Sequence, residues 1–232
     1  MNDYFERTIR LLGEEQFENV SKLSVVLLGL GGVGGSACEQ LTRLGIGYIT
    51  IVDNDKIAES NLNRQIIATT KTIGQYKTEA FKERMISINP NTRVDAKTIY
   101  FDESTLDEVF DKHYDYIIDC IDSVNSKLLL YKVAIEKNVK IISCMGTANK
   151  IDPSKLKISR LDKTADDKLA KKMRELCKKN GVDMKKINVC YSNEQNYSEN
   201  KINPLPSISL VPNAAGVMCA YFVLDDLLHC NK

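Results

Sequence analysis

The 232-residue sequence contains seven cysteines but no C-x-x-C pair. The missing pair argues against a tetrathiolate zinc site, and the odd number of cysteines argues against a disulfide framework. Most of these thiols are therefore expected to be small buried apolar residues. The first seven residues have no apolar core of signal-peptide length, and no apolar run approaches the roughly 18 residues of a membrane span. These absences predict a cytoplasmic protein with no membrane partner.

A large excess of one charge sign is also lacking. The net charge is only +1, and 43% hydrophobic with 27% charged residues is the composition of an ordinary globular protein. The charges are unevenly distributed, because residues 1–149 carry −4 and residues 150–201 carry +6. A basic segment suits a polyanionic partner. A solvated lysine-rich surface explains the same balance equally well.

Short apolar runs alternate with helical spacings of apolar residues as far as residue 144. The runs indicate buried strands at 23–28, 48–52, 93–98, 116–121 and 140–144. Helical spacing predicts helices at 33–44, 78–88 and 126–137. Such alternation is typical of a sheet built with right-handed crossovers. The sequence therefore predicts an α/β fold with a Rossmann-like, doubly wound, mostly parallel sheet.

The composition becomes lysine-rich and polar after Gly146. One amphipathic helix is indicated by Leu169, Met173 and Leu176, and an apolar helix is expected at 214–228. We place a boundary near residue 150. Residues 1–150 are expected to form the Rossmann-like domain, and residues 151–232 a basic C-terminal α/β extension that binds substrate.

A glycine-rich turn follows the first predicted strand. Gly29, Gly31, Gly32 and Gly34 fit the pattern G-x-G-x-x-G, in which glycines let phosphate approach the backbone at a helix N-terminus. Asp53 ends the second predicted strand, from which a carboxylate can accept hydrogen bonds from a ribose. These features predict a nucleotide site, but they would serve an NAD-dependent dehydrogenase equally well.

Four further stretches decide between an NAD-dependent dehydrogenase and another kind of nucleotide-binding protein. They are residues 52–55 (VDND), 60–65 (SNLNRQ), 73–80 (IGQYKTEA) and 119–123 (DCIDS). They resemble the ubiquitin-activating-enzyme-like superfamily of adenylating proteins, the ThiF/MoeB/HesA family. Acyl-adenylate formation needs cations on the triphosphate, a carboxylate for magnesium and backbone donors at the α-phosphorus. A dehydrogenase does not need these groups together.

The resemblance implies ATP and Mg²⁺ as cofactors. It places Asp53 at the ribose, Lys77 at the phosphates, and Asp122 at the metal with Ser123 beside it. The residues that match nucleotide-binding positions of the family are Gly29, Gly31, Gly32, Gly34, Asp53, Asp55, Ser60, Asn61, Asn63, Arg64, Gln65, Lys77, Asp122 and Ser123.

Four residues match catalytic positions of the family: Arg7, Arg64, Lys77 and Asp122. Arg7 matches an arginine that in relatives reaches the γ-phosphate bound by the partner subunit, which implies a homodimer. The alternative for Arg7, Arg64 and Lys77 is that each is only a surface charge.

Within the superfamily, residues 145–153, 162–164, 168–170 and 207–216 resemble the tRNA threonylcarbamoyladenosine dehydratase branch. That branch also lacks the zinc cysteines. The resemblance implies tRNA as partner and adenylation of the threonylcarbamoyl carboxylate, followed by ring closure with release of AMP. It leaves open a bound monovalent cation and a sulfur-relay or redox helper protein. Residues 166–169 depart from the branch, so the resemblance implies nothing about their local conformation.

Two other functions compete with this one. The first is an adenylating activator of a ubiquitin-like sulfur carrier, which often passes its acyl group to a cysteine; Cys177 and Cys190 are the candidates between residues 150 and 205. The second is an NAD-dependent oxidoreductase or a non-catalytic nucleotide-binding module. The absent C-x-x-C pairs weigh against the former, and the triphosphate cations weigh against the latter.

Overall fold

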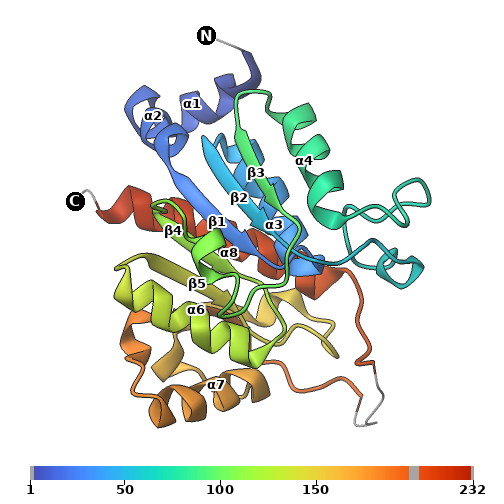
Figure 1. Ribbon diagram of the computed structural model, residues 1–232, viewed down its shortest axis with the longest axis vertical. Helices are drawn as coiled ribbons and strands as arrows, with labels where there is room; N and C mark the ends of the chain where they lie inside the picture. Colours follow the sequence, from blue (N-terminus) through green and yellow to red (C-terminus); the bar gives the residue numbers. More distant parts are fainter. Residues whose placement is uncertain (1–2, 199–203, 231–232) are drawn as a thin grey trace.

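The computed structural model describes residues 3–198 and 204–230, and a single seven-stranded sheet runs through the molecule (Figure 1). The strand order is β3-β2-β1-β4-β5-β7-β6. The strands are β1 Ser24–Leu28, β2 Tyr48–Val52, β3 Arg93–Lys97, β4 Tyr116–Asp119, β5 Lys140–Cys144, β6 Leu156–Arg160 and β7 Asn188–Ser192. All paired strands are parallel except β6, which is antiparallel to β7. The predicted doubly wound α/β fold is confirmed.

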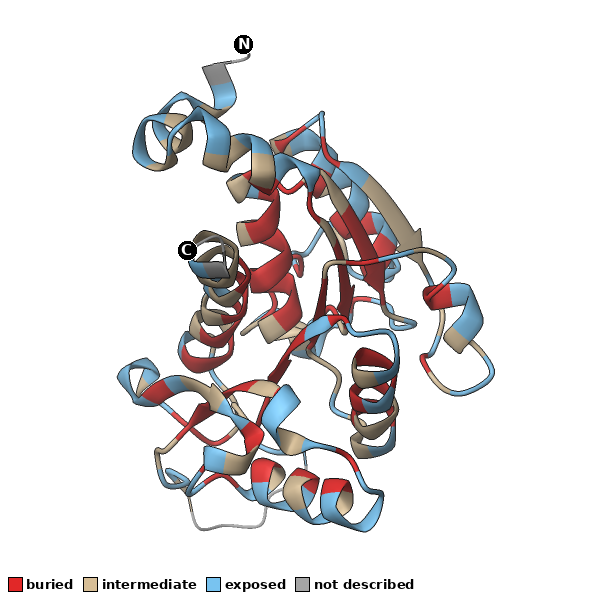
Figure 2. Ribbon diagram, turned by 90° about the vertical axis from the view of Figure 1, so that its left-hand side faces the viewer, coloured by how far each residue is buried: buried red, intermediate tan, exposed pale blue. Residues whose placement is uncertain are grey.

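Helices cover both faces of this sheet (Figure 2). One face packs against α2 Glu14–Lys22, α3 Gly32–Leu44, α4 Lys77–Ile88 and α8 Leu210–Cys230. The other packs against α5 Leu106–Val109, α6 Val124–Glu136 and α7 Lys168–Lys179. Because the central strands are buried on both faces, they are continuous apolar runs rather than alternating ones.

The chain reverses direction across the sheet next to β1. From β1 it proceeds outward through β2 to β3, and then returns to place β4 on the other side of β1. In doubly wound sheets, ligands bind in the crevice outside the carboxyl ends of the strands at this switch point. The carboxyl ends of β1 and β4 carry the Gly29 turn and residues 120–122, so the fold brings both predicted motifs to one edge.

Residues beyond 150 extend the same sheet. Strand β7 pairs in parallel with β5, and β6 forms the edge beside it. Helix α8 packs along α3, where a Cβ added to Gly216 would lie only 2.2 Å from the carbonyl oxygen of Val33. The division into 1–150 and 151–232 stays a prediction. Strands β5 and β7 lie on either side of this boundary in the sequence and are paired in one sheet.

Helix α8 is long and apolar enough to cross a membrane by length and composition, although the sequence suggested no such segment. The core helix of a soluble protein passes the same test, and 39% of this window is buried. Val211, Ala215 and Cys219 are fully buried against the sheet and α3. Pro212 lies in the first turn, where no intrahelical N–H is required. Packing within the domain therefore accounts for the buried side of this helix.

Several elements were not predicted from the sequence. Helices α1 Glu6–Leu12 and α2 precede the sheet, and β6 and β7 lie in the lysine-rich segment. Only Leu156 is buried in strand β6, which lies at the sheet edge, and its other four residues are partly or fully exposed. Such half-polar sequences lack the apolar runs that identified the central strands.

Candidate active site

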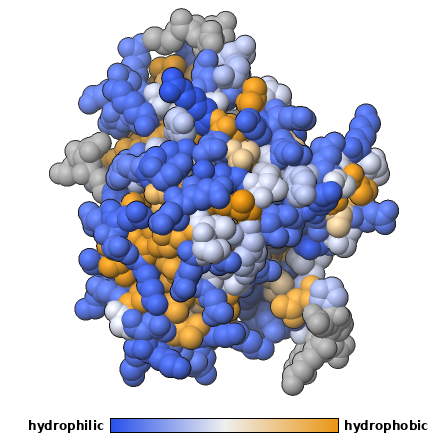
Figure 3. All heavy atoms as spheres, in the orientation of Figure 1, coloured by the Kyte–Doolittle hydropathy of each residue, from blue (hydrophilic) through white to orange (hydrophobic). Residues whose placement is uncertain are grey.

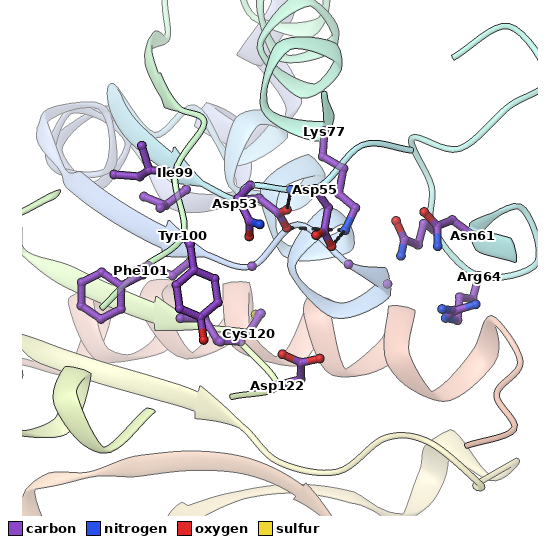
Figure 4. Close-up of a pocket in the computed structure, with 18 residues that line it drawn as sticks. Asp53, Asp55, Asn61, Arg64, Lys77, Ile99, Tyr100, Phe101, Cys120 and Asp122 are labelled. Carbon is purple, nitrogen blue, oxygen red and sulfur yellow. Dashed lines mark hydrogen bonds and ion pairs between the residues drawn. The ribbon is translucent and has the colours of Figure 1, made fainter. Parts of the chain in front are cut away.

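A cavity of about 460 Å³ opens at the carboxyl ends of β1, β2 and β4 (Figure 4). Its wall is formed by the glycine turn, residues 52–55, the 61–65 segment, Lys77, residues 99–101 and residues 120–122. Ten of the predicted binding residues line it: Gly29, Gly31, Gly32, Asp53, Asp55, Asn61, Arg64, Gln65, Lys77 and Asp122. Its size is in the range of small-molecule sites.

The glycine turn is shaped by close packing as well as by access to the cavity. Gly29 has φ +89°, and a Cβ there would lie 2.6 Å from the carbonyl oxygen of Cys120. A Cβ on Gly34 would lie 1.7 Å from the carbonyl oxygen of Gly29, so Gly34 packs α3 against β1 rather than lining the cavity. Gly31 and Gly32 remain exposed to the cavity at the start of α3, where unpaired backbone N–H groups favour an anion.

Two carboxylates and one lysine form a fixed group beside this turn. Asp53 accepts hydrogen bonds from the backbone N–H of Leu30 at 2.6 Å and of Asp55 at 2.7 Å. The Nζ atom of Lys77 lies 2.7 Å from Asp55 Oδ2 and 3.7 Å from Asp53 Oδ2. The Lys77 side chain is 6% exposed, whereas that of Asp55 is 61% exposed. A buried ammonium is thus held by one buried carboxylate and one exposed carboxylate.

The 60–65 segment presents a second cation. Arg64 donates from Nη1 to the carbonyl oxygen of Ser60 at 2.7 Å and to Asn63 Oδ1 at 2.8 Å. Ser60 and Asn63 do not line the cavity, so they orient the guanidinium instead. Gln65 is 7% exposed, and its Oε1 has no hydrogen-bond partner among the described residues. A bound molecule with a donor group could satisfy that buried oxygen.

Asp122 and Ser123 follow β4 and have different positions. The carboxylate of Asp122 lines the cavity opposite Lys77 (Figure 4). Ser123 lies outside the wall and caps α6, where its hydroxyl accepts from the backbone N–H of Ser126. The Ser123 side chain therefore fixes the start of a helix directly after Asp122.

Arg7 is not part of this cavity. It is an exposed residue of α1, at the amino-terminal side of the molecule (Figure 1). No residue of α1 lines the cavity wall. Within one chain, the structure therefore does not bring Arg7 together with Arg64, Lys77 or Asp122.

The sequence motifs missed an aromatic wall. Ile99, Tyr100 and Phe101 follow β3 and line the cavity. Hydrogen bonds to Ser123 and Ser126 lower the pKa of Tyr100. These residues could have been found from their place in the sequence, because they directly follow the strand predicted at 93–98. The carboxyl ends of parallel strands meet at the edge of the sheet where ligands bind.

The residues present fit a nucleoside triphosphate. Backbone donors at the start of α3 face the same cavity as two side-chain cations, Lys77 and Arg64. The exposed carboxylate of Asp122 is the type of oxygen ligand that Mg²⁺ prefers beside phosphates. A hydride-transfer site would have no need of both cations at this position.

The fold and the cavity define a doubly wound α/β protein with a glycine-rich anion site at its switch point. The chain belongs to the ThiF family, whose family model matches residues 5–232. It is 35% identical over 240 residues to the tRNA threonylcarbamoyladenosine dehydratase of Bacillus subtilis (strain 168), an alignment that covers 97% of this chain and 94% of that protein.

Solved structures agree with this relationship. The crystal structure of the Escherichia coli tRNA N6-threonylcarbamoyladenosine dehydratase, TcdA, in complex with ATP matches with a TM-score of 0.91 and 30% identity. The match covers 98% of this chain and 95% of that chain. A more partial relative is the adenylyltransferase and sulfurtransferase UBA4 of Vanderwaltozyma polyspora, 35% identical over 61% of this chain but only 31% of that protein.

Proposed function

We propose that this protein is an ATP-dependent dehydratase that adenylates the carboxylate of threonylcarbamoyladenosine in tRNA and cyclises it with release of AMP. The observation that carries the proposal is the cavity, which combines α3 backbone donors with Lys77 and Arg64. The near full-length similarity to dehydratases supports the same substrate. A reaction on tRNA with ATP fits a cytoplasmic location.

In this proposal, the triphosphate lies against Gly31 and Gly32, where the start of α3 favours negative charge. Lys77 then exchanges its contact with the exposed Asp55 for a phosphate oxygen, while Asp53 keeps its place and accepts from the ribose. Asp122 would hold Mg²⁺, which neutralises phosphate charge when bound. Arg64 meets the phosphates from the 60–65 segment.

Chemistry begins when a carboxylate oxygen of the substrate attacks the α-phosphorus and pyrophosphate leaves. Lys77 and Arg64 stabilise the negative charge that develops there, which is the largest contribution expected of such a site. A nucleophile within the same substrate then attacks the activated carbonyl carbon and expels AMP. Because an intramolecular attack has a high effective molarity, no enzyme nucleophile is needed.

Cys177 and Cys190, the two candidates for a thioester, fit this scheme better than the sulfur-carrier alternative. Cys177 is fully buried, and burial raises its pKa to about 11, although Lys178 and Lys179 are its sequence neighbours. Cys190 is also fully buried. Neither thiol is placed to accept an acyl group from the cavity, which an activator that forms a thioester requires.

The proposed tRNA surface is the outer side of α7. Ala170, Met173 and Cys177 face the core, which leaves a row of cations in solvent: Lys168, Lys171, Lys172, Lys178 and Lys179. Hydrophilic side chains predominate at the lower margin of the molecule, where α7 lies, beneath an apolar area on the same face (Figures 1 and 3). Exposed lysines of this kind bind phosphates without reading sequence.

Arg7 can take part in the proposed reaction only if the protein forms a dimer. Its position on α1, away from its own cavity, is compatible with a role at the γ-phosphate bound by a second copy of the chain. A bound monovalent cation and a sulfur-relay or redox helper stay predictions of the family resemblance.

The direct test is incubation of the protein with ATP, Mg²⁺ and tRNA that carries threonylcarbamoyladenosine. Nucleoside mass spectrometry should show the loss of one water from the modified adenosine, and only with ATP present. An unchanged nucleoside together with adenylation of a sulfur-carrier C-terminus would favour the alternative function.

A further inference from the structure

Three thiols from separate elements meet in the core, and the proposed reaction uses none of them. Cys144 in β5, Cys190 in β7 and Cys219 in α8 are 4%, 0% and 0% exposed. Their Sγ atoms all lie within 4.8 Å of one another. Cys144 and Cys190 are register partners of adjacent parallel strands, and α8 packs on both strands to supply the third sulfur.

The side chains around these sulfurs are mainly apolar, and one lysine side chain binds the backbone beside them. All three residues belong to the core cluster on the α3–α8 face of the sheet. The ammonium of Lys127 is fully buried and donates to the carbonyl oxygen of Cys144 at 2.8 Å. A dry cage of three soft donors would bind a soft cation well and exclude water-demanding ions.

We propose that Cys144, Cys190 and Cys219 form a three-coordinate thiolate site for the soft monovalent cation Cu(I). With metal–sulfur bonds of about 2.3 Å, a trigonal site separates its sulfurs by about 4.0 Å. Sulfurs that already lie within 4.8 Å need only a small contraction to reach that spacing. Zinc would require a fourth ligand in a structural site, whereas thiolates alone suit Cu(I).

Binding releases protons in a defined number. Three S–H bonds break, three copper–sulfur bonds form, and three protons pass to the buffer for each Cu(I) bound. The copper stays in its +1 state, so no oxidant or reductant is consumed. The resulting site has a net charge of −2. The nearby Lys127 ammonium is already paired with Asp119 Oδ2 at 3.0 Å.

A fourth cysteine provides a route into the cage. Cys120 lines the nucleotide cavity, and its side chain interacts with that of Cys219. An ion that enters the cavity can therefore bind Cys120 first and be passed inward by exchange between thiolates. Cys120 also packs against the glycine turn, because a Cβ on Gly29 would lie 2.6 Å from the carbonyl oxygen of Cys120.

The test is an anaerobic titration of the reduced full-length protein with Cu(I) against a chromophoric Cu(I) chelator. All proteins carry Cys230→Ser, which removes the cysteine nearest the C-terminus. We expect one tightly held Cu(I) per chain and the release of about three protons, followed with a pH indicator. Cys144→Ala should weaken binding by at least about 100-fold.

Cys177→Ala is the matched control, because Cys177 is equally buried but lies on the opposite face of the sheet. It should bind Cu(I) like the parent protein. Cys219→Ser serves as a second cage variant, and retained ATP affinity shows that a variant has folded. The proposal is overturned if the parent holds no copper against the chelator, or if the cage and control variants bind it equally.

Discussion

The two parts of the chain on either side of residue 150 contribute different things to the cavity. Every residue that lines it lies between Leu28 and Asp122. The later part supplies β6, β7, α7 and α8, which extend the sheet and cover α3. The residues that line the proposed nucleotide site thus all lie before residue 150, and the proposed tRNA surface lies after it.

The later part nevertheless contacts the 60–65 segment, which forms part of the cavity wall. Asn213 donates from Nδ2 to the carbonyl oxygen of Arg64 at 3.1 Å. The side chain of Asn63 donates to the carbonyl oxygen of Ser207 at 2.9 Å. These bonds hold the 60–65 segment by its backbone and by a neighbour of Arg64. In the proposed function, the first part binds the nucleotide, while the second part holds the 60–65 segment in place and offers the basic surface.

The largest effect is expected inside the cavity. Asp122→Ala should reduce ATP turnover by on the order of a hundredfold or more, because it removes the carboxylate that would hold the metal beside the phosphates. The fold should survive, since Asp122 is exposed. The measurement is pyrophosphate release at saturating tRNA, with thermal unfolding as a check on folding.

Asp107→Ala is a suitable control, because Asp107 is also exposed but lies on α5 outside the cavity wall. It should leave turnover unchanged. Near wild-type turnover in folded Asp122→Ala protein would remove Asp122 from the site and weaken the contrast between the two parts.

A smaller effect is expected on the basic surface. Reversal of Lys171, Lys172, Lys178 and Lys179 to glutamate should weaken tRNA binding and make it less sensitive to salt, because each lost phosphate contact lowers the salt slope by about 1. ATP affinity should not change. Fluorescence anisotropy with labelled tRNA at several salt concentrations measures both quantities.

Lys22→Glu with Lys82→Glu provides the comparison, because both lysines are exposed on helices of the opposite face. That pair should alter tRNA affinity much less for each reversed charge. If the quadruple α7 variant binds tRNA with wild-type affinity and slope, α7 is only a solvated face and the RNA lies elsewhere.

Much of the fold was predictable because buried parallel strands have a simple sequence pattern. The ranges predicted for β2 and β5 agree with the structure at both ends, and α3 begins one residue earlier than expected. The later strands were missed for a physical reason. Strand β7 has a polar residue at each end, and β6 is a half-exposed edge, so neither forms a long apolar run.

The site motifs could be located from the sequence. Which residues of each motif line the cavity could not be predicted. Ser60, Asn63 and Ser123 belong to the same motifs as Arg64 and Asp122, yet they orient or cap instead of lining the cavity. That distinction depends on backbone direction at a loop, which motif spacing does not encode. Tyr100 was missed because no motif includes it, although its place after β3 was predictable.

The central claim is adenylation of the substrate carboxylate, and an oxygen label follows it directly. The substrate is tRNA whose threonylcarbamoyl carboxylate carries ¹⁸O, incubated with the protein, ATP and Mg²⁺. If that carboxylate attacks the α-phosphorus, the AMP expelled on cyclisation must keep one labelled oxygen, which mass spectrometry of the released AMP detects. Unlabelled AMP, or label found in inorganic phosphate with ADP as the second product, would contradict the account.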